Sequence, residues 1–274
     1  MDMRWSVDSD APSYTPPGRA LPAGLTRRML EAEICLVFAL SLGRSGIYAL
    51  VDLIASATSP GRLSNQTAVL NGTLSPGRPW LDLTLQLLAI GFGLVPCLLV
   101  VHLLHRSGES MRVIGFDAST RGRDLFRGAA LAAIIGGIGL AFYLLTFAIG
   151  VDLTVVAENL PDVWWRIPVL VLSALENALL EELVVVGYLV RRLGQLGWGP
   201  RSAVVCSAVV RGSYHLYQGL GGFLGNAAMG LVFARLFQRW GRVAPLVVAH
   251  ALVDMVAFVG YALLVGQVGW LPTP

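Results

Sequence analysis

The feature that most constrains this chain is a series of apolar stretches near residues 33–56, 80–105, 127–149, 164–190, 202–218, 220–238 and 243–266. Each is long enough to cross about 30 Å of hydrocarbon as an α-helix. Only 14% of the 274 residues are charged, whereas a soluble domain has about 25% charged residues. We therefore predict an all-α integral membrane protein, a polytopic bundle of about seven transmembrane helices, with residues 31–274 as a single membrane domain.

The basic residues indicate how this bundle lies in the membrane. All 20 are arginine; 15 fall on one side of the predicted topology and three on the other, with Arg44 and Arg211 inside spans. Because cytoplasmic loops carry the excess of basic residues, we predict a multi-pass cell-membrane protein with a cytoplasmic N-terminus and an outside C-terminus. The basic charge thus reflects orientation in a lipid bilayer, not nucleic-acid binding. The absence of lysine is typical of a GC-rich bacterial genome.

The first 30 residues differ from the rest of the chain. They are polar and Pro-rich and lack the apolar core of a cleavable signal peptide. We expect residues 1–30 to form a flexible cytoplasmic tail.

Three of the spans carry ionisable side chains, which inside a membrane are costly and usually functional. They are Glu181 and Glu182 in the fourth span, Arg211 and His215 in the fifth, and His250 and Asp254 in the seventh. Both of the latter pairs have i,i+4 spacing, so on a helix each pair shares a face. Three helices that each carry a polar face can satisfy one another only by converging, so we predict a cavity lined by these acids and imidazoles.

The fourth span also has a predicted polar stripe. At 100° per residue, Asn177, Glu181 and Tyr188 lie within about 40° of one line along the helix. Asn177 and Tyr188 are therefore supporting candidates for the site. Tyr214 is expected to be a packing residue, with hydrogen bonding to a substrate carbonyl as the alternative. Arg44 and Asp52, in the first span, are expected to pair structurally with other spans.

These six residues can be interpreted either as structural contacts between helices or as a functional site. Any single pair can be a hydrogen-bonded contact between helices. All six together suit chemistry better, because a carboxylate beside imidazoles can take a proton from water while the imidazoles hold the nucleophile or a metal. Asp254 can orient His250 or join it at the reacting centre.

The order and spacing of these residues resemble a known family. Glu181-Glu182 followed by Gly187, then His215, then His250-xxx-Asp254 is similar to the three motifs of the CPBP family, the CAAX proteases and bacteriocin-processing (Abi) proteins, including CAAX prenyl protease 2. The similarity covers about residues 125–265. It implies an intramembrane endopeptidase in which Glu181 activates water, Glu182 supports it, and His215, His250 and Asp254 complete the site.

The resemblance leaves the cofactor and the substrate open. Two histidines and a carboxylate (His215, His250 and Glu181) can hold a divalent metal, most naturally zinc, with one open position. A metal-free glutamate–histidine mechanism would use the same residues. The expected substrate is a membrane-associated peptide or membrane protein, and the oligomeric state is not predicted.

The sequence departs from the family pattern at two positions. The motif-one arginine is replaced by Val186, and the phenylalanine before the motif-two histidine is replaced by Arg211. We hypothesise that Arg211 supplies from the fifth span the guanidinium normally sent from the fourth, pairing with Glu181 or Glu182. The alternatives are a non-catalytic membrane scaffold or immunity-type protein with a degenerate site, and a small transporter.

One feature of the predicted spans conflicts with a shared site. At 1.5 Å per residue, His215 lies deeper from the cytoplasmic end than Glu181 or His250 when all helices are straight. Either the fifth span begins after Pro200, or the Gly-rich turn at residues 219–222 is sunk into the membrane, enclosed by protein. We favour the second explanation.

Overall fold

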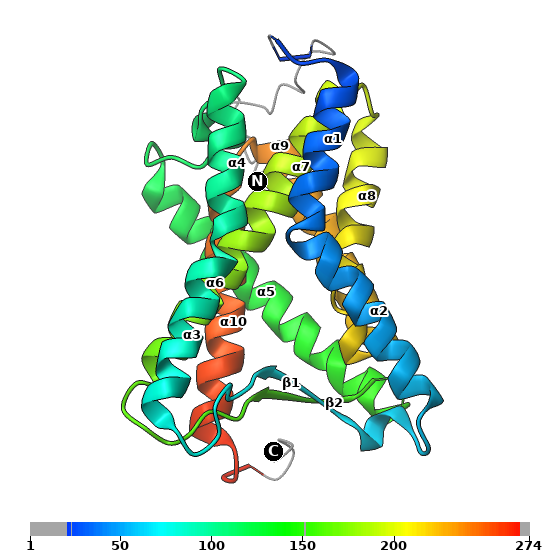
Figure 1. The fold of residues 1–274 in the computed structure, drawn as a ribbon, viewed down its shortest axis with the longest axis vertical. Helices are drawn as coiled ribbons and strands as arrows, with labels where there is room; N and C mark the ends of the chain where they lie inside the picture. Colours follow the sequence, from blue (N-terminus) through cyan, green and yellow to red (C-terminus); the bar gives the residue numbers. More distant parts are fainter. Residues whose placement is uncertain (1–20, 23, 151, 269–274) are drawn as a thin grey trace, which may run out of the picture.

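The computed structural model describes residues 21, 22, 24–150 and 152–268, and within them the chain is mostly helical (Figure 1). The α-helices are α1 (Arg27–Ala39), α2 (Leu42–Thr58), α3 (Pro79–Gly93), α4 (Val95–Arg106), α5 (Arg121–Ala148), α6 (Arg166–Glu181), α7 (Leu189–Gln195), α8 (Pro200–Ser213), α9 (Leu220–Trp240) and α10 (Ala244–Leu264). A π-helical segment, Glu182–Tyr188, joins α6 to α7, and short 3-10 turns lie at Leu63–Asn65, Met111–Ile114 and Leu216–Gln218.

Fewer helices than the seven predicted are long and apolar enough to count as membrane spans. In the described part of the chain, the helical stretches long and apolar enough to cross a membrane are Pro79–Arg106, Arg121–Ala148, Leu220–Trp240 and Ala244–Leu264. The bent pair α1–α2, with 51° between its helices, makes a fifth. The segment α6–α7 is broken by the π-helix, and α8 has only 14 residues, about 21 Å of helix. Multi-pass membrane character is supported, while the count of seven stays a prediction.

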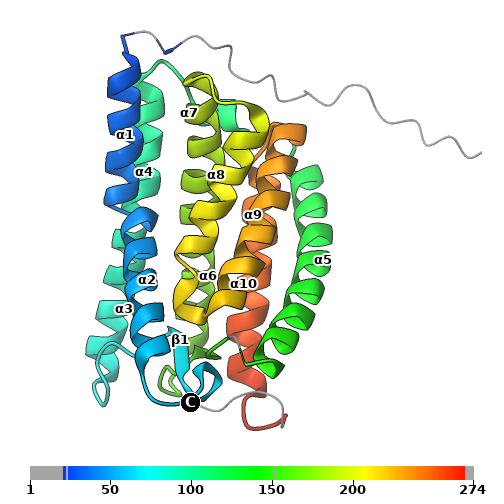
Figure 2. The same ribbon diagram turned by 90° about the vertical axis from the view of Figure 1, so that its right-hand side faces the viewer.

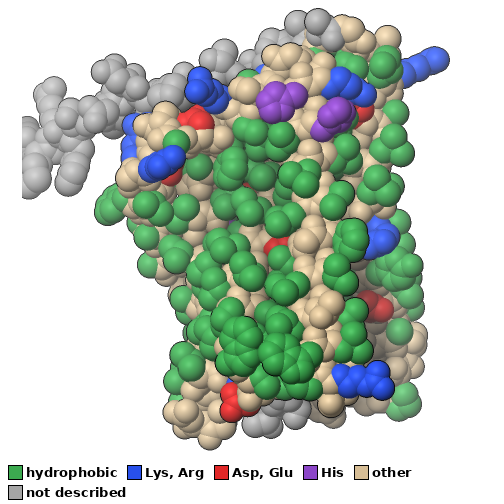
Figure 3. All heavy atoms as spheres, turned by 60° about the vertical axis from the view of Figure 1, so that its left-hand side comes forward, with side chains coloured by type: hydrophobic (Ala, Val, Ile, Leu, Met, Phe, Trp, Pro, Cys, Tyr) green, Lys and Arg blue, Asp and Glu red, His purple; other side chains and the backbone are tan. Residues whose placement is uncertain are grey.

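The arginine-rich helix ends gather at one end of the bundle. This is the end at which α1 begins, α4 ends, and α8 and α10 begin, drawn uppermost in Figure 1. A wide band of hydrophobic side chains covers the middle of the face shown in Figure 3, and most of its histidine and charged side chains lie toward the two ends. This distribution suits a bundle crossing a bilayer. Which end faces the cytoplasm stays a prediction.

A small sheet at the opposite end was not predicted. Strand β1 (Thr67–Asn71) pairs in parallel with β2 (Thr154–Glu158), with Thr67 opposite Thr154 and Asn71 opposite Glu158. Parallel strands need a long crossover, which α3, α4 and α5 supply here. The all-α prediction is therefore correct for the bundle but misses this sheet, which lies among the lower ends of the helices in Figures 1 and 2.

Several helix boundaries follow from local sequence chemistry. Thr26 caps α1, its hydroxyl accepting a hydrogen bond from the backbone N–H of Met29 at 3.2 Å, as helix N-caps do. Four residues of the predicted tail, 27–30, thus belong to α1, whereas residues 1–20 and 23 lie outside those that the structure describes. Gly241, with φ of +66°, ends α9 because a left-handed residue terminates a helix cheaply only when it is glycine.

The turn between α8 and α9 is enclosed by protein. The helix α8 begins at Pro200, so the first explanation for the depth of His215 is wrong. The segment before β2 covers the turn: the backbone N–H of Leu153 donates to the carbonyl of Gln218 at 3.0 Å. The buried carboxylate of Asp152 accepts from the N–H of Gly221 at 2.7 Å. A turn so covered fits the second explanation, since irregular backbone at membrane depth must be buried in protein.

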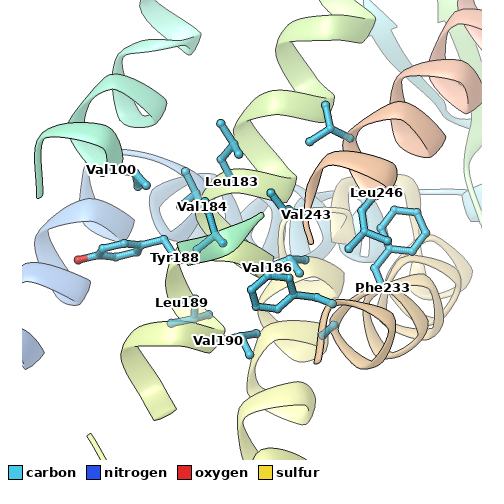
Figure 4. Close-up of a cluster of buried hydrophobic side chains, with 14 of the residues drawn as sticks. Val100, Leu183, Val184, Val186, Tyr188, Leu189, Val190, Phe233, Val243 and Leu246 are labelled. Carbon is cyan, nitrogen blue, oxygen red and sulfur yellow. The ribbon is translucent and has the colours of Figure 1, made fainter. Parts of the chain in front are cut away.

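The largest core surrounds the π-helical segment. Residues 182–188 are all buried, and α6 runs through the middle of the bundle with α10 beside it (Figure 2). Figure 4 shows the side chains of Val184, Val186 and Tyr188 packed in this cluster with residues of α4, α9 and α10. Seven consecutive residues are buried because neighbours surround this segment on every side.

Candidate active site

The two adjacent glutamates stand at the junction of two helix types. Glu181 is the last residue of α6 and Glu182 the first of the π-helical segment. Single π-turns inside α-helices are frequent at functional sites. Glu182 is fully buried, whereas Glu181 keeps 8% of its surface exposed. The two carboxylates therefore have different environments, since both are buried but only Glu181 keeps any accessible surface.

Arg211 of α8 neutralises this pair. Its guanidinium forms a close ion pair with Glu182 and lies 3.8 Å from Glu181 Oε2. Arg211 is itself fully buried, and its Cζ lies 5.3 Å from the ring centroid of Phe233. The ion pair predicted for Arg211 is thus present in the structure. Val186, at the position of the missing motif-one arginine, packs in the hydrophobic core (Figure 4).

His250 of α10 lies between two acids. Its Nδ1 is 2.7 Å from Glu182 Oε1, and its Nε2 is 3.7 Å from Asp254 Oδ2. Asp254 also accepts a hydrogen bond of 3.4 Å from the side-chain amide of Asn177 on α6. Asn177 therefore holds the acid that flanks His250, as a supporting residue would.

His215 lies just beyond the end of α8. Its Nδ1 is 3.0 Å from the carbonyl oxygen of Arg211, which fixes the proton on Nδ1 and leaves a lone pair on Nε2. The ring packs against Tyr214, with ring centroids 4.8 Å apart. Glu181 interacts electrostatically with both His215 and His250.

Tyr214 packs as expected, in a buried cluster with Leu42 and Val185, and it also belongs to the site. Its hydroxyl donates a hydrogen bond of 2.8 Å to Glu181 Oε2, a contact that the sequence did not predict. No pattern in the sequence distinguished it, because it lies one residue beyond α8 and outside the helical spacing that linked Arg211 to His215.

One expectation is corrected by the structure. Tyr188 does not share a stripe with Asn177 and Glu181, because the π-turn rotates the residues that follow it. Its ring packs in the core under Arg192, whose Cζ lies 5.3 Å from the ring centroid.

The acids and imidazoles contact one another, and a cavity lined by them stays a prediction. A hollow of about 500 Å³ lies on the other side of Tyr214 and is lined by α2, Tyr214 and Tyr217.

The fit of the site to a metal ion can be judged from its donor groups. Among the described residues, no group of three or more His, Cys, Asp or Glu side chains is arranged to hold a metal. Glu182 and Nδ1 of His250 face each other, and Glu181 is held by Tyr214. The arrangement of these side chains does not fit the predicted zinc site of Glu181, His215 and His250.

The side chains from α6, α8 and α10 therefore form one continuous set of contacts. An inner ion pair, Arg211–Glu182, supports Glu181, and imidazoles from two other elements stand beside it. Ionisable side chains gathered inside a helical membrane bundle mark a functional site.

Residues 162–256 match the family described as type II CAAX prenyl endopeptidase Rce1-like. This match confirms the resemblance to CAAX proteases, and the matched segment contains every ionisable residue of the cluster. It is shorter than the predicted core of residues 125–265. No curated protein and no solved structure matches the chain.

Proposed function

We propose that this protein is an intramembrane endopeptidase that cleaves a membrane-associated peptide or membrane protein with water activated by Glu181. The observation that carries the proposal is the unequal pair of glutamates. Arg211 and His250 hold Glu182 inside the core, while Glu181 keeps 8% of its surface exposed and is held by the hydroxyl of Tyr214. A fully enclosed, ion-paired acid suits a supporting role, and the neighbouring acid with some accessible surface suits the general base.

The chemical step uses groups of this chain only. Glu181 takes a proton from water, and the resulting hydroxide attacks the peptide carbonyl carbon. The C–N bond then breaks, and the proton held by Glu181 passes to the departing amine. His250, when both ring nitrogens carry protons, donates to Glu182 from Nδ1 and has Nε2 available for the carbonyl oxygen as negative charge develops there.

His215 and Asp254 complete the proposed machinery. With its proton on Nδ1, His215 can accept a hydrogen bond from water through Nε2 and so position the nucleophile. Asp254 Oδ2 lies 3.7 Å from Nε2 of His250, on the opposite side of the ring from Glu182 and beyond hydrogen-bond length. Its charge therefore balances the doubly protonated ring and leaves the Nε2 proton free for the substrate oxygen. Each proposed role follows from a contact of the residue rather than from its position in a motif alone.

A purified-protein assay tests the proposal. Wild type, Glu181→Gln and Glu176→Gln are reconstituted in nanodiscs and given a set of fluorogenic membrane peptides. Glu176 is the matched control, because it lies on the same helix and its carboxylate packs against Gly93 of α3. We expect Glu181→Gln to lose cleavage at an unchanged melting temperature, while Glu176→Gln still cleaves.

The same assay examines the metal and the scaffold alternative. Each protein is measured with and without a chelator, and then after zinc is restored. Activity lost to the chelator and regained with zinc would support the metal-dependent alternative. If wild type and Glu181→Gln cleave equally or neither cleaves any peptide, the protease proposal fails and a non-catalytic scaffold is the better interpretation.

A further inference from the structure

One face of α2 carries charged groups that the site does not use. Arg44, Tyr48 and Asp52 follow one another at intervals of four residues, so they share a helix face, and all three are exposed. Sequence analysis expected Arg44 and Asp52 to pair with other spans. In the described part of the chain neither has an ion-pair partner. Charged side chains on a membrane-spanning segment need water or a counter-charge, and a charged ligand can supply the second.

This face forms one wall of the hollow beside the site. The hollow has a volume of about 500 Å³, and its lining includes Arg44, Tyr48 and Asp52 on one side and Tyr214 and Tyr217 on the other. Its size is that of a small-ligand or peptide site. Because the ring of Tyr214 lines the hollow and its hydroxyl binds Glu181, one side chain separates the hollow from the proposed general base.

The α2 wall is fixed against α8. A Cβ atom at Gly46 would lie 2.7 Å from Ser213 Oγ, so the two helices approach as closely as glycine allows. Leu42 also packs with Val185 and Tyr214 in a buried cluster. These contacts place the face of α2 that carries Arg44 and Asp52 beside Tyr214.

The spacing of the charges defines a complementary ligand. Arg44 and Asp52 are eight residues apart, about 12 Å along the helix axis. An extended peptide covers that distance in three to four residues, at 3.3–3.6 Å each. A guanidinium binds a carboxylate, and a carboxylate binds an ammonium or guanidinium group. The hydroxyls of Ser45, Tyr48 and Tyr217 offer hydrogen bonds to a peptide backbone.

We propose that this hollow, called the α2 groove below, binds the peptide substrate in an extended form. An acidic side chain of the peptide then pairs with Arg44, and a basic side chain three to four residues away in the peptide pairs with Asp52. The inference rests on the proposed function, since it names the substrate feature that the protease would select. It makes α2 the specificity-determining element, outside the residues that carry out the chemistry.

Binding is measured apart from cleavage by using Glu181→Gln protein in phosphatidylcholine nanodiscs and fluorescently labelled peptides. Four peptides of one apolar sequence are compared: Asp and Lys four residues apart, the same pair in reverse order, the pair adjacent, and a neutral Asn/Gln version. We expect one order of the spaced pair to bind at least tenfold tighter than the neutral peptide. Arg44→Gln and Asp52→Asn should each remove most of that gain and leave binding of the neutral peptide unchanged.

Exchanging the two charges of the protein tests the inference most directly. Protein with Arg44→Asp and Asp52→Arg should prefer the opposite order of charges in the peptide. Equal affinity for charged and neutral peptides, or equal loss for both in the single variants, overturns the inference. So does displacement of the charged peptide by anionic phosphatidylglycerol in the nanodisc, which would assign the groove to lipid headgroups.

The outcomes separate this inference from the protease proposal. If wild type cleaves charged and neutral peptides with equal kcat/KM, the proposal of peptide selection by the α2 groove is refuted and the protease proposal is supported. If Glu181→Gln binds peptides in a charge-dependent way but wild type cleaves none of them, the protease proposal is refuted and the proposal of peptide selection by the α2 groove is supported.

Discussion

Replacing Arg211 by leucine tests how the buried acids are tolerated. The side chains of Arg211 and Glu182 are both completely buried, and no other arginine of the described chain forms an ion pair with either glutamate of the site. Removing one partner of such a pair leaves an uncompensated charge in the core and costs about 3–5 kcal/mol. Leucine fills much of the arginine volume, so the loss reports charge more than cavity formation.

The expected change is large on the scale of protein stability. A loss of about 4 kcal/mol lowers the folded-to-unfolded ratio by roughly a thousandfold, since 1.4 kcal/mol is a factor of ten. The free energy of unfolding is measured by reversible unfolding in mixed micelles. Arg235→Leu is the control, because Arg235 is an exposed residue of α9. The control should stay within about 0.5 kcal/mol of wild type, as surface substitutions usually do.

Two second-site changes make the test specific. Adding Glu182→Gln to Arg211→Leu removes the orphaned charge, so at least half of the lost stability should return. Adding Val186→Arg returns a guanidinium to the family position; Val186 belongs to the same buried cluster as Phe233, the residue beneath Arg211. Arg211→Leu protein as stable as the Arg235→Leu control would refute the claim that Arg211 compensates the buried glutamates.

Two further predictions concern single contacts. Tyr214→Phe removes the hydroxyl that donates to Glu181 at 2.8 Å but keeps the ring. A hydrogen bond to a charged group contributes about 1.5–3 kcal/mol to stability, so the melting temperature should fall by several degrees and kcat of the folded protein should fall about 10- to 100-fold. An unchanged kcat of the folded protein would exclude a role in holding the base. In the loop before α5, the side chain and the backbone N–H of Ser119, together with Arg242, lower the pKa of Asp117 to about 2. Because the folded-state pKa lies below the ordinary value, this contribution to stability is fully present above pH 4 and is lost as the pH falls toward 2. Unfolding measured from pH 5 to pH 2 should therefore show a smaller stability loss for Asp117→Asn than for wild type, and parallel curves would contradict this assignment.

The sequence predicted the members of the cluster because intramembrane charges have few explanations. Glu181, Glu182, Arg211, His215, His250 and Asp254 were chosen on burial cost alone, and the structure joins them through one set of contacts. The i,i+4 spacing of His250 and Asp254 held because α10 is regular through both residues. Periodicity was a sound guide wherever the helix remained an α-helix.

The errors occur where regular geometry stops. Tyr188 was assigned to the polar stripe by α-helical rotation, and the π-turn invalidates that rotation beyond Glu182. The contact of Tyr214 with Glu181 was missed because Tyr214 follows the last residue of α8. The sheet of β1 and β2 depends on pairing between residues 87 positions apart, which no local pattern encodes.

The departures from the family pattern also have a structural meaning that a motif comparison lacks. A valine in place of the motif-one arginine suggests a degenerate site when each motif is judged alone. Ion pairing depends on where the guanidinium lies, and Arg211 brings it to Glu182 from a different helix. At the motif-one position, Val186 packs among apolar side chains of the core. The ion pair of Arg211 with Glu182 therefore supports the hypothesis that the two substitutions compensate each other, and the Arg211→Leu variants decide between it and the degenerate interpretation.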